Sequence, residues 1–146
     1  MPKAFRILNY AIAAEVLIQA ALIAWAVFGL SKYVDHGGVI DKQNWVEGDD
    51  VPFDGAYGFT IHNINGAALI PLLGLALLVV AFVSKIPGGV RFAGILFVLI
   101  LVQAYLLPVL SSGIPLIGAL HGATALVILG MTITGAKMGA RAMAAT

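Results

Sequence analysis

The chain contains no cysteine, which excludes disulfides, thiolate metal sites, iron–sulfur ligation and covalent attachment of a c-type haem. Charge is also scarce, because only 10% of the 146 residues are charged and the formal net charge is +1. A water-soluble domain carries about 25% charged residues. Hydrophobic residues make up 61% of the sequence and the mean hydropathy is +1.02. This composition indicates lipid as the solvent and argues against a cytosolic globular enzyme.

Four apolar runs have about the 20 residues that a helix needs to cross roughly 30 Å of hydrocarbon. They are Phe5–Leu30, Tyr57–Ser84, Val90–Leu110 and Ile114–Ala136. They lack the alternation of a barrel strand, and lipid requires each backbone polar group to be satisfied within its segment. The expected fold class is an all-α membrane protein, in which residues 1–146 form a single membrane domain, a four-transmembrane-helix bundle.

Most basic residues flank one side of this predicted bundle. Six of the eight lie beside the chain termini and the second connection, namely Lys3, Arg6, Lys85, Arg91, Lys137 and Arg141. The positive-inside rule makes that side cytoplasmic, so both termini are expected inside. The connection Ser31–Ala56 is then an external acidic loop, a solvated connector favoured over a calcium site because it lacks EF-hand spacing. Trp45, Phe53 and Tyr57 predict that part of it rests on the membrane interface.

Prolines and serines give local predictions within the spans. Pro71 and Pro108 fall inside apolar runs and are expected to bend their helices, because proline removes an i to i−4 hydrogen bond. Ser111 and Ser112, followed by Pro115, predict the start of the fourth helix, with a capping residue and then an early proline.

An internal repeat relates the two halves of the chain. Leu17–Ala24 (LIQAALIA) resembles Leu101–Pro108 (LVQAYLLP), and each segment ends five residues before a glycine. Ile61-His62 then resembles Leu120-His121. The bundle is therefore predicted to consist of two helix-hairpin repeats related by an axis along the membrane normal. Chance similarity between apolar helices is the alternative, so the prediction depends on the paired Gln19/Gln103 and His62/His121.

His62 and His121 are the candidate metal ligands. They are expected about five and about seven or eight residues into two helices of like direction, roughly 7–12 Å below the outer boundary. An ionisable residue inside a membrane span is a functional hypothesis by default. Two imidazoles at matched depth predict axial ligands that approach one metal from opposite sides.

The residues one helical turn from these histidines are small: Gly58, Gly66, Gly118 and Ala125. Small residues let a flat macrocycle approach the backbone closely, whereas a bare zinc ion needs a third and a fourth protein ligand. The expected cofactor is one bis-histidine haem b, whose other iron ligands come from the porphyrin. Three alternatives remain: helix packing through the small residues, an interfacial His62 bonded to the loop, and another tetrapyrrole or metal.

Further polar residues lie within the spans. Gln19 and Gln103 are expected near the histidine layer, either as hydrogen-bond partners of the imidazoles or, equally, as interhelical contacts. Glu15 lies one turn away from Gln19 and is interpreted as a proton carrier, a quinone contact or a neutral packed residue. His36 has no spatial argument as a ligand.

The order of these motifs, a glutamine in the first helix, a histidine and glycine in the second and Leu-His in the fourth, resembles a family of small bacterial four-helix integral membrane proteins. It is also similar to four-helix cytochrome b bundles, whose histidines clamp haem. The resemblance covers nearly the whole chain except residues 31–56. It implies His62 and His121 as ligands and the bacterial plasma membrane as location. The inner histidine layer of di-haem bundles is missing, which predicts one outer haem rather than a complete electron conduit.

The sequence therefore favours a haem b electron-transfer protein or an accessory subunit of a respiratory complex, with a quinone or another redox protein as partner. The alternatives are a cofactor-free structural membrane subunit docking onto a larger complex, and a haem sensor or transfer protein. No nucleophile–base pair, phosphate loop or zinc motif supports a hydrolase or transferase. The basic residues are too few and too dispersed for nucleic-acid binding, and an electron carrier is favoured over a stand-alone enzyme.

Overall fold

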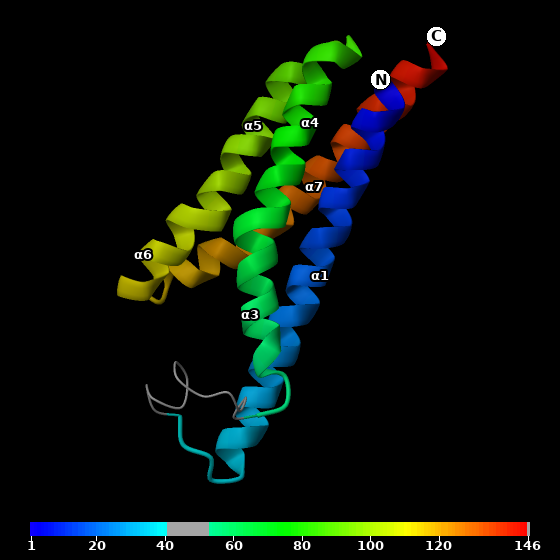
Figure 1. Cartoon of the computed structure of the whole chain (residues 1–146). Coiled ribbons are helices and arrows are strands. Elements are labelled where there is room, and N and C mark those ends of the chain that lie inside the picture. The colour runs from blue at the N-terminus through cyan, green and yellow to red at the C-terminus, as the bar shows by residue number, and fades with distance from the viewer. Residues whose placement is uncertain (41–52, 146) are drawn as a thin grey trace. The chain divides into compact units, whose positions relative to one another are not determined.

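The structure, a computed structural model, describes residues 1–40 and 53–145. The predicted interfacial Trp45 and the loop acids Asp41, Glu47, Asp49 and Asp50 lie outside these ranges. Regular structure in the described ranges is helical, with four spans that are long and apolar enough to cross a bilayer. They are α1 (Pro2–Asp35), α3–η1–α4 (Ala56–Ser84), α5–η2–α6 (Gly89–Gly113) and α7 (Ile117–Ala144) (Figure 1). The chain thus has the helices of a multi-pass membrane protein.

The helix ends differ from those expected. The first helix continues through Ser31–Asp35, so these residues do not belong to the loop. The fourth helix begins at Ile117 rather than Ile114 and continues beyond Ala136 to Ala144. Lys32 and Arg141 lie in the last turns of their helices, where a positive charge interacts favourably with the helix dipole. Both helices therefore continue into polar residues beyond the ends of their apolar runs.

Ser111 and Ser112 close the third helical span instead of starting the fourth, so that prediction is wrong. α6 (Leu107–Gly113) contains both serines. The Ser111 hydroxyl donates to the Leu107 carbonyl, and the Ser112 hydroxyl donates to the Val109 carbonyl at 2.7 Å. Serine hydroxyls can bond back to the preceding turn in this way. α7 begins after Leu116, without a capping side chain.

Each proline within a span follows a π-helical turn. η1 (Asn65–Leu69) ends two residues before Pro71, and η2 (Val102–Leu106) ends two residues before Pro108. Proline cannot donate to the carbonyl four residues earlier and its ring crowds that carbonyl. A π-turn accommodates such a defect without ending the helix. The sequence predicts a bend at each proline, and the structure has a π-turn shortly before each of them.

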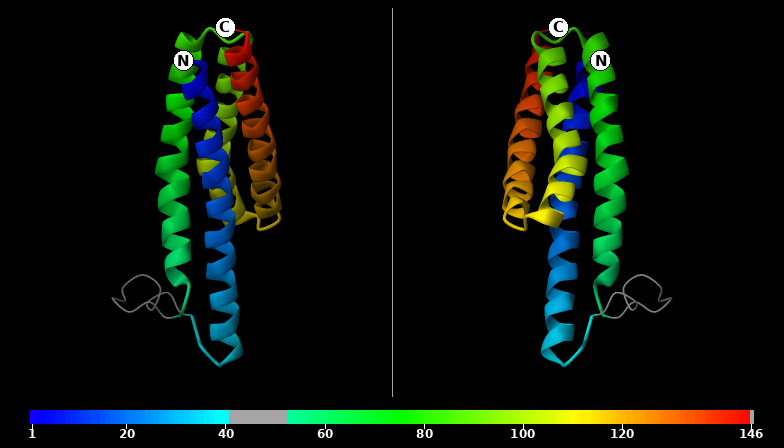
Figure 2. Two further views of the ribbon diagram at one scale, coloured as in Figure 1. Left: turned by 90° about the vertical axis from the view of Figure 1, so that its right-hand side faces the viewer. Right: turned by 90° about the vertical axis from the view of Figure 1, so that its left-hand side faces the viewer.

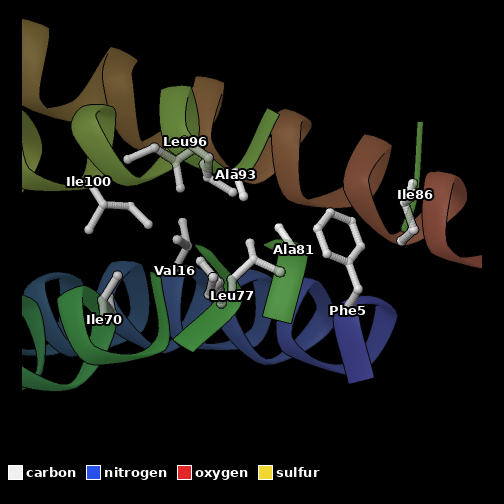
Figure 3. Close-up of a cluster of buried hydrophobic side chains, with 11 residues drawn as sticks. Phe5, Val16, Ile70, Leu77, Ala81, Ile86, Ala93, Leu96 and Ile100 are labelled. Atoms are coloured by element: carbon white, nitrogen blue, oxygen red, sulfur yellow. The ribbon is translucent and has the colours of Figure 1, made fainter. Parts of the chain in front are cut away.

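The chain divides into two compact units. The larger unit comprises Met1–Val16 and the chain from Gly66 onward, and the smaller unit is Leu17–Asn65. In the larger unit, α4 (Ile70–Ser84) and α5 (Gly89–Leu101) lie side by side, and α7 packs on α5 and α6 (Figures 1 and 2). Figure 3 shows its apolar core, whose most buried members include Phe5, Ile12, Leu77, Leu96, Ile100 and Ile128.

Small residues of α7 face the first part of α1 within this larger unit. Gly135 and Gly139 form a GxxxG pair, a spacing that allows membrane helices to approach closely. A Cβ atom on Gly139 would lie 2.9 Å from the Arg6 Cβ, and one on Gly135 would run into the Asn9 side-chain oxygen. Asn9 is fully buried, and its Nδ2 donates to the Phe5 carbonyl at 2.9 Å. The two backbones therefore meet in direct contact.

Three parts of the larger unit come together at one end. The start of α1, the turn between α4 and α5 and the end of α7 lie there (Figure 2). These segments carry all six of the basic residues that the charge pattern assigns to one side: Lys3, Arg6, Lys85, Arg91, Lys137 and Arg141.

Candidate functional site

In the smaller unit, the second half of α1 packs closely against α3 (Ala56–Ile64) and the segment that precedes it. A Cβ on Gly58 would lie 2.6 Å from the Leu22 carbonyl oxygen and 3.0 Å from the Ala26 Cβ. Further along α1, Gly29 lies against the Asp54 backbone. Glycine is required where backbones approach this closely. The contacts fix the register of α3 on α1 and leave no room between them at Gly58.

His62 lies in this register six residues after the start of α3 and is half-buried. Its Nδ1 is 3.2 Å from the main-chain carbonyl oxygen of Gln19 in α1. A carbonyl only accepts hydrogen bonds, so Nδ1 carries the proton and the lone pair of the neutral ring resides on Nε2. Metal-binding histidines are commonly oriented by a bond of this kind. The contact thus sets both the tautomer and the orientation of the ring.

His36 makes a similar bond in a different setting. Its Nδ1 is 2.7 Å from the Lys32 carbonyl oxygen, four residues earlier in the same stretch of chain. The side chain is exposed at the end of α1. The His36 contact is therefore local, whereas the His62 contact joins two helices.

The Gln19 side chain does not bond to His62, which was one of the two roles that the sequence left open for it. The main-chain carbonyl makes that bond instead, and Gln19 as a whole residue is 8% exposed. Neither the nitrogen nor the oxygen of its side-chain amide has a hydrogen-bond partner within residues 1–40 and 53–145.

His121 and Gln103 form the second glutamine–histidine pair, in the larger unit. Gln103 lies in η2, and its Nε2 donates to the main-chain carbonyl of His121 at 2.9 Å. His121 is half-buried and lies four residues after the start of α7. Each glutamine is therefore in contact with one histidine, and the main-chain carbonyl belongs to the glutamine in one contact and to the histidine in the other.

The small residues expected beside the histidines differ in their surroundings. Gly58 packs on α1, as described above. A Cβ on Gly118 would meet no atom within 4 Å, so the backbone of α7 is open there. Ala125 packs against the apolar core and Gly66 lies half-buried in η1. The structure brings His62 together with Gln19 and Gly58, and His121 together with Gln103 and Gly118, each set within its own unit.

The remaining polar groups do not form a bare-metal site. No group of three or more His, Cys, Asp or Glu residues that could hold a metal ion occurs in the described part of the chain. Glu15 is half-buried in the larger unit, and its Oε2 is enclosed with no hydrogen-bond partner among the described residues. A ligand set of two imidazoles suits a metal whose other ligands come from a macrocycle.

Tyr105 is a polar residue that the sequence reasoning missed. Its hydroxyl donates to the Ala67 carbonyl at 2.6 Å, from η2 to η1 within the larger unit. Ala67 lies four residues before Pro71, so its carbonyl is the acceptor that the proline leaves without an N–H donor. Two features of the sequence could have indicated this bond. They are the hydroxyl of Tyr105 within an apolar span and Pro71 in the neighbouring span.

Comparison of this chain with family models, curated proteins and solved structures gives no match.

Proposed function

We propose that this chain is a haem b-binding electron-transfer protein of the bacterial plasma membrane, or an accessory subunit of a respiratory complex there. In this proposal His62 and His121 would hold one haem b in the outer half of the membrane. The observation that carries the proposal is the bond from His62 Nδ1 to the Gln19 carbonyl. That bond directs the lone pair of a membrane-embedded imidazole to Nε2, the atom that would coordinate iron.

The chain's own residues would hold and tune the group. His62 and His121 would supply two neutral imidazoles, and the open backbone at Gly118 would admit the edge of a flat ring. Gln103 fixes the backbone beside His121 through its bond to the carbonyl. When bound, haem b supplies one-electron redox chemistry, and a quinone or a redox protein would be the electron partner. The two glutamine–histidine contacts support the predicted hairpin repeat.

The test is a reduced-minus-oxidised visible spectrum of the full chain, purified in mild detergent from haem-replete cells. We expect a low-spin b-type α band that His62→Ala and His121→Ala each abolish. His36→Ala is the matched control, because it removes an imidazole with the same Nδ1 contact outside the proposed ligand set. This variant should retain the full band.

Two results would overturn the assignment. One is a helical, monodisperse wild-type protein with no haem, and the other is a band that survives both ligand variants. Circular dichroism of each variant separates loss of ligand from loss of fold.

The second candidate function is a cofactor-free structural subunit, and the packing of Gly58 favours it. One of the glycines expected to face a macrocycle instead contacts Leu22 and Ala26 of α1. Small residues serve helix association in membranes. A colourless wild-type protein that co-purifies in fixed stoichiometry with a membrane complex would support this function.

A further inference from the structure

The end of the larger unit formed by the start of α1, the α4–α5 turn and the end of α7 has an unbalanced positive charge. Its basic residues are Lys3, Arg6, Lys85, Arg91, Lys137 and Arg141, and all except Arg6 are exposed. The one acidic residue of the larger unit is Glu15. It lies nine residues beyond Arg6, which corresponds to about 13 Å along α1. No carboxylate side chain among the described residues of this unit therefore neutralises the basic end.

Four of the six basic residues share a second feature. Four residues further into its helix, on the same face, each has a large exposed side chain. The pairs are Lys3 with Ile7, Arg6 with Tyr10, Arg91 with Ile95 and Lys137 with Ile133, in which the second member is 54%, 49%, 52% and 43% exposed. Arg6 also places its guanidinium 5.6 Å from the centre of the Tyr10 ring.

From this arrangement we infer that the basic end binds anionic phospholipids of the surrounding leaflet. A phospholipid joins a phosphate to acyl chains, and each pair offers a cation for the phosphate and an apolar side chain one turn deeper for the chain. Long basic side chains reach from the apolar zone to the headgroups. A soluble anion would use the cations alone. The positive-inside orientation places this end at the leaflet in which anionic lipids attract basic residues.

The test measures lipid selectivity with the full chain in phosphatidylcholine vesicles. Trace spin-labelled phosphatidylglycerol or spin-labelled phosphatidylcholine reports the fraction of lipid immobilised by the protein. We expect phosphatidylglycerol to associate about three- to fivefold more strongly at low salt, in line with about 1 kcal/mol for each basic residue near the surface. Raising NaCl from about 0.01 M to about 1 M shortens the screening length from about 30 Å to about 3 Å. The preference should then fall towards one.

Variants assign the preference to this end of the molecule. The combined Lys3→Gln, Arg91→Gln and Lys137→Gln variant should lose most of it, while the control Lys32→Gln, in the last turn of α1, should keep it. Equal association of the two lipids in the wild type overturns the inference. An equal loss in the Lys32 variant, or displacement of the lipid by inorganic phosphate at constant ionic strength, also overturns it. If the triple variant does not fold, the salt dependence of the wild type and Arg91→Gln alone decide the outcome.

Discussion

At the scale of single residues, glycine has two distinct roles in this chain. Gly58 and Gly139 lie where an added Cβ would be within 3 Å of another helix. Gly118 and Gly130, in contrast, have no atom within 4 Å of an added Cβ. The first pair is needed for contact between helices, since only a residue without a side chain fits. At the second pair, no other described residue covers the backbone of α7, which is therefore accessible from outside the helix.

Substitution of glycine by alanine should therefore have opposite effects at Gly58 and Gly130. Gly58→Ala places a methyl group 2.6 Å from the Leu22 carbonyl oxygen, and we expect a loss of about 1–3 kcal/mol in the free energy of unfolding from overpacking. Gly130→Ala should be neutral or stabilising by up to about 1 kcal/mol, because alanine favours the helix. Unfolding titrations in mixed micelles measure both values. Equal changes for the two variants would show that the Gly58 contact is absent in the folded protein.

At the scale of helical elements, the π-turns and the prolines act together. Pro71 deprives the Ala67 carbonyl of its usual N–H donor, and the Tyr105 hydroxyl from the neighbouring π-turn supplies a substitute. Within a bilayer an unsatisfied carbonyl is costly because no water is present to replace the bond. The α3–α4 helix thus depends on a side chain from a different span.

Tyr105→Phe should lower stability by about 0.6 kcal/mol, the average measured for hydrogen bonds between membrane helices, and by at most about 1.7 kcal/mol. Pro71→Ala restores a backbone N–H at residue 71 that can bond to Ala67, so the cost of Tyr105→Phe should become close to zero in that background. A double-mutant cycle of unfolding free energies measures this coupling. Tyr57→Phe, an exposed tyrosine of α3, serves as the control. An equal cost of Tyr105→Phe with and without Pro71 would refute the substitution of one donor for the other.

At the scale of the whole molecule, the distribution of the basic residues predicts the orientation in the membrane. Both chain ends of the larger unit lie at its basic end, and basic segments remain on the cytoplasmic side. The start of the long connection is reached at Val39, which is 70% exposed. We expect Val39 outside and the C-terminal end of α7 inside.

The absence of native cysteine makes this orientation simple to measure. A single Val39→Cys variant should react with a membrane-impermeant maleimide in intact bacteria. A single Ala145→Cys variant should react only after the cells are permeabilised. Labelling of Ala145→Cys in intact cells would reverse the predicted topology.

Hydropathy alone was sufficient to predict the four helical spans, because about 20 apolar residues have few alternatives to a helix in lipid. It did not predict the helix ends, since α1 continues past Lys32 and Ser111 bonds within its own helix. The repeat predicted that Gln19 and Gln103 lie near the histidines, but not which glutamine contacts which histidine. The atoms that form each bond could not be predicted. They depend on the register between two helices, which is set by close contacts such as that between Gly58 and the Leu22 carbonyl and not by residue type alone.

The spans differ in length, and this has a consequence for the bilayer. The apolar run within α1, Phe5–Leu30, is about 39 Å long as a helix, whereas the run Val90–Leu110 of the third span is about 32 Å long. A single bilayer thickness therefore produces unequal hydrophobic mismatch along the two helices, which tilt or local thickening must absorb. Longer acyl chains reduce this mismatch for α1, so membranes rich in such lipids should accommodate the chain with less deformation.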